Sequence, residues 1–283
     1  VPATAEITQT SEFDGGPQQG ANYRTIALIV ACAMFMEHLD ATVLTTALPT
    51  MAHEFGVTPP EMSVSLTSYL LALAVFIPAS GAMADKFGAK SVFRWAIVLF
   101  MLGSIACGLA QNLGSMVAAR FAQGMGGAMM MPVGRLVLLR TVAKRDMVSA
   151  MAWLVMPTLI GPIVGPPVGG FIVTYLDWRW IFWINLPIGL VGIFLVTRFI
   201  PATRVATPPP FDWMGFLLSA AALGCLLAGF EVAIQPDALS QAGLLLAIGV
   251  VAGALYVRHA KRKAHPTLDL SLMQVPTFRL SVI

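Results

Sequence analysis

Apolar stretches of about 20 residues recur along this chain, and a helix of that length crosses the roughly 30 Å hydrocarbon core of a bilayer. Hydrophobic residues make up 57% of the chain and charged residues only 11%, whereas soluble domains carry roughly 25% charge. Helices satisfy their own backbone groups in lipid, so the sequence predicts an all-α membrane protein. We expect eight spans: Thr25 to Leu48, Met62 to Met83, Val92 to Ala110, Met116 to Leu139, Val148 to Tyr175, Ile181 to Phe199, Trp213 to Ala233 and Ala242 to Val257.

Lys and Arg gather in alternate loops, which indicates the orientation because basic loops stay on the cytoplasmic side. The loops after the even-numbered spans hold Lys86, Lys90, Arg94, Arg140, Lys144, Arg145, Arg198, Arg204, Arg258, Lys261, Arg262 and Lys263, whereas the opposite loops hold Arg179 alone. We therefore expect a multi-pass protein of a bacterial plasma (inner) membrane with a cytoplasmic N-terminus. The net charge of +3 reflects this topology, and we expect no nucleic-acid partner.

The spacing of the spans divides the chain into four parts. Residues 1–22 read as a polar cytoplasmic tail, and residues 23–200 hold six spans joined by short loops. Residues 201–265 begin with a linker rich in prolines, which interrupt helices, and contain two more spans. Residues 266–283 resemble the start of a further span. We therefore interpret the chain as a portion of a longer protein that lacks its C-terminal half.

Three ionisable residues fall inside predicted spans, where exposure to lipid costs several kcal/mol. Asp40 and Arg120 lie within the first and fourth spans, and Glu37 precedes Asp40 by three residues, on nearly the same helix face. Asp40 is interpreted as a proton or cation site, with a structural hydrogen bond to another helix as the alternative. Glu37 could share that role or attract cations from a cavity wall. For Arg120 one interpretation is purely structural: it would brace helices by bonding to backbone carbonyls.

Five segments in order resemble motifs of the major facilitator superfamily, and in particular of its fourteen-span drug:proton antiporters. They are residues 39–49 (LDATVLTTALP), 81–90 (GAMADKFGAK), 120–127 (RFAQGMGG), 161–170 (GPIVGPPVGG) and 178–189 (WRWIFWINLPIG). The resemblance implies two six-helix bundles around a central cavity, with two helices inserted between them. This chain would then hold the N-terminal six-helix bundle and the two inserted helices, with the second bundle missing. The resemblance also implies that Arg120 helps to relay a proton.

The loop after the second span is expected to act as a gate, on the strength of that resemblance. Its residues are Gly81, Asp85, Lys86, Gly88 and Lys90. Asp85 could pair with Arg135 or Arg140 at the end of the fourth span and latch one conformation, with a solvated loop charge as the alternative. The family usually has Arg where Lys86 and Ala89 stand, so the charge network of the loop could be weaker here.

The fifth span combines small and helix-bending residues in the segment that resembles the antiporter motif: Gly161, Pro162, Gly165, Pro166, Gly169 and Gly170. Small residues allow close helix contact and Pro bends the helix that contains it, so this span could seal tightly and still pivot. At the start of the sixth span, Trp178, Trp180 and Trp183 are interpreted as an interfacial aromatic belt.

Together these features predict a proton-coupled exporter of drugs or similar apolar or cationic small molecules. Protons are the expected coupling ion, and no other cofactor, metal site or enzymatic reaction is expected, because the sequence offers no metal-ligand pair, nucleophile elbow or phosphate loop. Two alternatives remain: a transporter of a metabolite such as a sugar or an amino acid, and a fragment that does not transport by itself.

Overall fold

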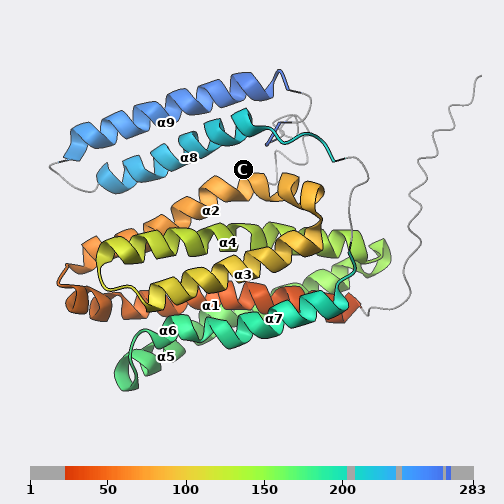
Figure 1. The fold of residues 1–283 in the computed structure, drawn as a ribbon, viewed down its shortest axis with the longest axis horizontal. Helices are drawn as coiled ribbons and strands as arrows, with labels where there is room; N and C mark the ends of the chain where they lie inside the picture. Colours follow the sequence, from red (N-terminus) through yellow and green to blue (C-terminus); the bar gives the residue numbers. More distant parts are fainter. Residues whose placement is uncertain (1–22, 203–207, 234–237, 264–265, 269–283) are drawn as a thin grey trace, which may run out of the picture.

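Long helices lying side by side make up the computed structural model, which describes residues 23–202, 208–233, 238–263 and 266–268 (Figure 1). The helices are α1 (Tyr23–Phe55), α2 (Pro59–Phe87), α3 (Ala89–Gly108), α4 (Leu113–Thr141), α5 (Met147–Tyr175), α6 (Trp180–Trp183), α7 (Asn185–Phe199), α8 (Trp213–Ala233) and α9 (Leu239–Ala260), with a short 3₁₀ turn η1 (Lys144–Asp146) before α5. The predicted tail and most of the predicted ninth span lie outside the described residues. The all-α prediction is confirmed.

Seven helical segments of the described residues are long and apolar enough to cross a membrane. The predicted fourth span is the exception. It forms the 29-residue helix α4, but Arg120, Gln123 and several glycines lower its hydropathy. These residues are buried against neighbouring helices, so a sequence of lower hydropathy is compatible with a central position in the bundle.

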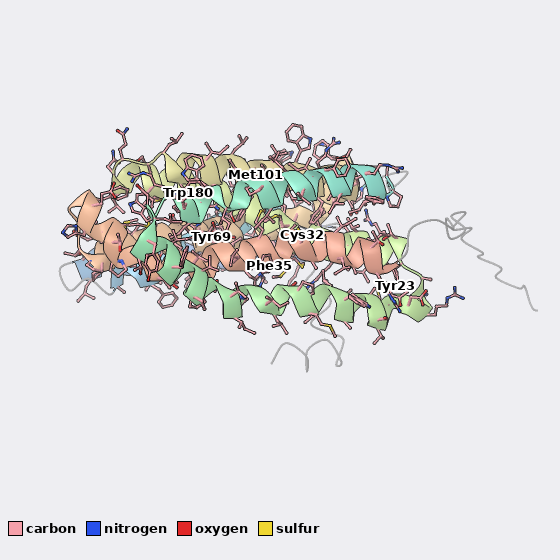
Figure 2. All side chains as sticks on the ribbon, turned by 90° about the horizontal axis from the view of Figure 1, so that it is seen from below. Tyr23, Cys32, Phe35, Tyr69, Met101 and Trp180 are labelled. Carbon is pink, nitrogen blue, oxygen red and sulfur yellow. The ribbon has the colours of Figure 1, made fainter. Side chains whose placement is uncertain are left out.

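Helices α1 to α7 pack together, and α8 and α9 form a hairpin beside them (Figure 1). Helix α4 lies between α2 and α3, and α1 packs chiefly against α5 and also contacts α7. The hairpin touches this bundle through α8 and α2, so α8 and α9 lie on the side opposite α5 (Figure 1). Figure 2 shows the same bundle turned by 90°.

Two short junctions shape the bundle. Gly88 both ends α2 and precedes α3, and its φ of 87° lies in the left-handed region that glycine adopts without steric cost. The predicted sixth span is divided at Ile184 into α6 and α7. Pro187, in the first turn of α7, lacks the backbone N–H that would continue the helix through this point.

Candidate functional site

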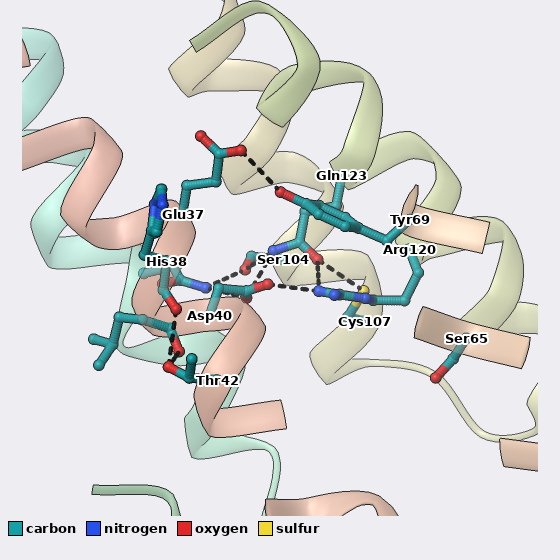
Figure 3. A network of polar contacts seen from close by, with 12 residues as sticks. Glu37, His38, Asp40, Thr42, Ser65, Tyr69, Ser104, Cys107, Arg120 and Gln123 are labelled. Atoms are coloured by element: carbon teal, nitrogen blue, oxygen red, sulfur yellow. Dashed lines mark hydrogen bonds and ion pairs between the residues drawn. The ribbon is translucent and has the colours of Figure 1, made fainter. Parts of the chain in front are cut away.

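Asp40 is buried near the middle of α1 and accepts hydrogen bonds from three side chains on two other helices (Figure 3). Arg120 Nη1 lies 2.6 Å from Oδ2, and the amide nitrogens of Gln123 and Asn185 lie 2.9 and 2.7 Å from Oδ1. The side chains of Asp40 and Arg120 are both 0% exposed. The sequence placed these two residues inside the bundle, and the structure brings them together as an ion pair.

Gln123 and Ser104 connect the partners of Asp40 to one another. Arg120 Nη1 also donates to Gln123 Oε1 at 2.7 Å, and Gln123 and Asn185 both donate to Ser104 Oγ, at 3.0 and 2.9 Å. Helices α1, α3, α4 and α7 therefore each contribute a side chain to one buried polar network. A buried charged pair needs such hydrogen bonds to offset the cost of desolvation, and the Asp40 carboxylate receives three of them.

Glu37 joins this network through Tyr69 rather than through Asp40 (Figure 3). The Tyr69 hydroxyl lies 3.5 Å from Glu37 Oε1, and the guanidinium of Arg120 lies 4.5 Å from the centre of the Tyr69 ring. Within the described part of the chain, Glu37 Oε2 and two nitrogens of Arg120, Nε and Nη2, are buried without a hydrogen-bond partner. Asn185 Oδ1 is a second acceptor in the same position, so the described network keeps two acceptor oxygens and two donor nitrogens that are not used.

These contacts define what the site can do chemically. A proton arriving on Asp40 would remove the negative charge that faces Arg120, and the freed guanidinium would need another acceptor because an unpaired buried charge is costly. Glu37, which Tyr69 links to the network, is the other carboxylate of the described network, and its Oε2 has no hydrogen-bond partner. The arrangement can therefore convert a protonation event into a change of side-chain partners between α1, α2 and α4.

The predicted gate lies at one end of the bundle, and its main contact is the predicted one. Arg140 on α4 forms an ion pair with Asp85 on α2, while the alternative partner Arg135 is exposed. Lys90 Nζ donates to the Thr197 backbone oxygen at 2.9 Å, which ties α3 to α7.

The other three residues of this loop make no contact across the bundle in the described structure. Lys86 lies over the ring of its neighbour Phe87, Gly88 forms the junction between two helices, and a side chain on Gly81 would meet open space. The charge contacts of the gate therefore come from Asp85 and Lys90.

Three of the four glycines in the predicted antiporter segment press α5 against α1. A Cβ on Gly161 would stand 3.0 Å from His38 Cβ, one on Gly165 would stand 2.0 Å from Thr42 Oγ1, and one on Gly169 would stand 2.1 Å from Thr46 Oγ1. Gly170 has open space beside it, so close packing does not explain that glycine. The prolines point the other way: Pro162 and Pro166 are exposed, and α5 continues through both.

At the end of the bundle opposite the gate, Trp178 differs from the predicted interfacial belt. Trp178 is buried, contacts the rings of Phe55 and Phe182 edge-on, and donates its indole N–H to Glu54. It is therefore a packing residue rather than part of an interfacial belt. Trp180, by contrast, is exposed.

Four network residues were not identified as site residues from the sequence: Gln123, Ser104, Asn185 and Tyr69. Gln123 and Asn185 stand inside quoted motifs, and each of the four is a polar group within an apolar span. That signal could have flagged them, because polar side chains in lipid-spanning helices usually face one another. It could not have indicated which of them meet.

Comparisons with known proteins agree with this architecture. The family model described as Major Facilitator Superfamily matches residues 30–256. A multidrug resistance protein MdtD of Salmonella heidelberg, a name assigned provisionally, is 42% identical over 93% of this chain and 56% of its own length. The corresponding protein of Citrobacter koseri is 41% identical over 90% of this chain and 54% of its own length. The chain thus spans about half the length of the curated relatives it matches.

Solved structures show the same fold at low sequence identity. The POT family transporter PepTSo aligns with 95% of this chain and 58% of its own at a TM-score of 0.62 and 15% identity. The human organic anion transporter MFSD10 aligns with 78% of this chain and 60% of its own at a TM-score of 0.58 and 16% identity. These similarities establish the transporter fold and carry no information on substrate.

Proposed function

Because the chain belongs to the major facilitator superfamily, we propose that it is the N-terminal part of a proton-coupled exporter of drugs or other small apolar or cationic molecules. Residues 23–200 would form the first bundle, residues 201–265 the linker with its two inserted helices, and residues 266–283 the start of the second bundle. The protein would lie in a bacterial inner membrane, with the basic loops and the N-terminus in the cytoplasm.

The observation that carries this proposal is the buried Asp40–Arg120 pair inside the four-helix polar network. An antiporter needs a group whose charge comes and goes as the two bundles rock about the site. Protonation of Asp40 would release Arg120, and the released guanidinium would favour a different packing of α4 against α1 and α2. Proton binding would in this way bias the equilibrium between two conformations.

The ion pair between Asp85 and Arg140 would act as the cytoplasmic latch of one of those conformations. The α1–α5 interface, where Gly165 and Gly169 meet Thr42 and Thr46, would form the seal about which α5 pivots. The provisional name of the MdtD relatives supports drugs as the cargo. A metabolite transporter with the same fold is the second candidate.

The experiment is a drug-susceptibility assay in an efflux-deficient bacterial host that produces the full-length protein. Wild type should raise resistance and Asp40→Asn should abolish the gain, because Asn cannot take up or release the proton. Asp146→Asn, which alters a partly exposed acid at the end of η1, is the matched control and should behave as wild type. Equal susceptibility with wild type, Asp40→Asn and empty vector would contradict drug export and favour the metabolite candidate.

Transport by the 283-residue chain alone is a separate question. Alternating access needs two halves that rock about the site, so we expect no proton-driven uptake by vesicles that contain only this chain. Uptake that collapses with the pH gradient in such vesicles would contradict this expectation.

A further inference from the structure

We infer that a surface cavity at the end of the bundle opposite the basic loops binds an organic ammonium group. The cavity has a volume of about 510 Å³ and is lined by Asp177, Arg179, Trp180 and Trp183. It lies at the α5–α6 junction, where Trp180 is labelled in Figure 2. None of its lining residues belongs to the buried network around Asp40, so the two sites are distinct.

The charges beside the cavity favour a cation. Arg179 is the cation of this cluster, and its Nη2 lies 2.7 Å from Glu54 Oε1. Its Nη1 lies 3.4 Å from both oxygens of Asp177, a longer and weaker contact. Two carboxylates thus share one guanidinium, so this cluster carries an excess of one negative charge. Asp177, with its side chain 53% exposed, is the carboxylate that lines the cavity.

The aromatic lining selects the kind of cation. Trp180 and Trp183 stand three residues apart on α6, and Trp180 is 53% exposed. Indole faces attract cations through the ring quadrupole, and Trp is the strongest of the aromatic residues in this role. A weakly hydrated alkylated ammonium can lose water against an indole more cheaply than a small inorganic ion can. The combination therefore fits a methylated or otherwise substituted ammonium.

Two sources could supply such a group: a free organic cation, or the headgroup of a zwitterionic lipid such as phosphatidylethanolamine. Both would place the ammonium near Asp177 and the apolar part of the molecule against the tryptophans. The chemistry of recognition is the same, so the experiment below separates them by the composition of the membrane.

The test measures binding of tetramethylammonium to the chain in phosphatidylglycerol nanodiscs by titration calorimetry, after subtraction of empty nanodiscs. We expect saturable binding that Asp177→Asn weakens roughly tenfold and Trp180→Ala weakens by a similar factor, with partial recovery in Trp180→Phe. Asn at position 177 retains the oxygen that accepts the Arg179 backbone N–H at 2.8 Å, so the turn should persist. Circular dichroism checks that each variant keeps its helices.

Asp146→Asn, at the basic end, is the charge-matched control and should leave binding unchanged. Nanodiscs of phosphatidylethanolamine then identify the source: unchanged affinity indicates a free cation as the ligand, and weakened affinity indicates competition by the lipid headgroup. Binding that is absent in phosphatidylglycerol, or that is the same in wild type, Asp177→Asn and Trp180→Ala, would overturn the inference.

Discussion

Two aspartate–arginine pairs in this molecule use the same chemistry in opposite surroundings. The Asp40–Arg120 pair is buried completely and shares its hydrogen bonds with Gln123, Asn185 and Ser104. The Asp85–Arg140 pair lies at the end of the bundle, with side chains 31% and 23% exposed. A buried pair is costly to break because each charge loses its partner and has no water to replace it, whereas an exposed pair separates cheaply. The buried pair therefore suits a switch operated by protonation, and the partly exposed pair suits a latch that opens and closes.

Removing one partner of the buried pair should have the largest effect. Arg120→Met leaves Asp40 buried without its cation, and we expect a loss of about 3 to 5 kcal/mol in the free energy of unfolding. Thermal unfolding in detergent, followed by circular dichroism, measures it. The double variant Asp40→Asn with Arg120→Met removes both charges and should recover part of the loss. If Arg120→Met unfolds at the wild-type temperature, the pair does not stabilise the bundle.

The seal between α1 and α5 should come next. In Gly165→Ala the new Cβ would stand 2.0 Å from Thr42 Oγ1, which already bonds to the His38 and Leu39 backbone oxygens at 2.8 and 3.1 Å. The helices must separate or Thr42 must give up these bonds, at a cost of about 1 to 3 kcal/mol. Gly170→Ala, beside open space, is the matched control and should be near neutral in the same unfolding assay. Equal losses in both would show that the contact with Thr42 is not the cause, since Ala favours a helix more than Gly does.

A third aspartate offers an intermediate case at the base of the α8–α9 hairpin. His259 Nε2 lies 2.9 and 3.1 Å from the two carboxylate oxygens of Asp212, and the Gly215 amide donates at 3.1 Å. Desolvation by itself would raise the pKa of Asp212, but these hydrogen bonds outweigh it and hold the pKa below its ordinary value.

The stability linked to Asp212 is therefore present above the unfolded-state pKa of about 4 and is lost as the pH falls through the lower folded-state value. We expect Asp212→Asn to lower the free energy of unfolding by about 1 kcal/mol at pH 7. The variant should also lose the acid-sensitive part of the stability of the hairpin. Hydrogen exchange of α8 and α9 between pH 7 and pH 3 measures it. An unchanged acid response in the variant would show that other carboxylates cause it.

The partly exposed Asp85–Arg140 pair should give the smallest effect. Asp85→Asn should change the free energy of unfolding by less than about 1 kcal/mol, because both side chains remain hydrated when separated. The wild-type contribution should also shrink in high salt, as expected for exposed charges. Unfolding at low and high ionic strength checks both points. A loss as large as that of Arg120→Met would remove the distinction between the two pairs.

The sequence predicted the helices and one of the two pairs well, for physical reasons. Lipid forces long apolar helices, so nearly every span could be located from composition. Asp85 and Arg140 lie at the C-terminal ends of α2 and α4, two helices that run in the same direction and so bring these ends to the same side of the bundle. The partner of Asp40 was harder to predict. A charged residue within a span indicates burial, but which neighbouring helix its side chain faces depends on how the helix is rotated about its axis. These segments are weakly amphipathic, so their sequences do not indicate that rotation.

The same limit explains the residues that were missed. Ser104 and Asn185 are single polar groups in apolar helices. Only packing shows that Asn185 bonds to Asp40 and to Ser104, and that Ser104 also bonds to Gln123. The fourth span was predicted and forms α4, although its hydropathy is low because its glycines and Arg120 serve contacts with neighbouring helices. The separation of α6 from α7 depends on Pro187, which the sequence showed but which the continuous apolar run concealed.

Gly88 has a mechanical consequence. Because this one residue stands between α2 and α3, the two helices share a joint with almost no slack, and its positive φ makes glycine the residue that fits there without strain. Any tilt of α2 must therefore drag the start of α3 with it. A displacement of Asp85, three residues before Gly88, would therefore be transmitted to α3 as a rigid-body movement.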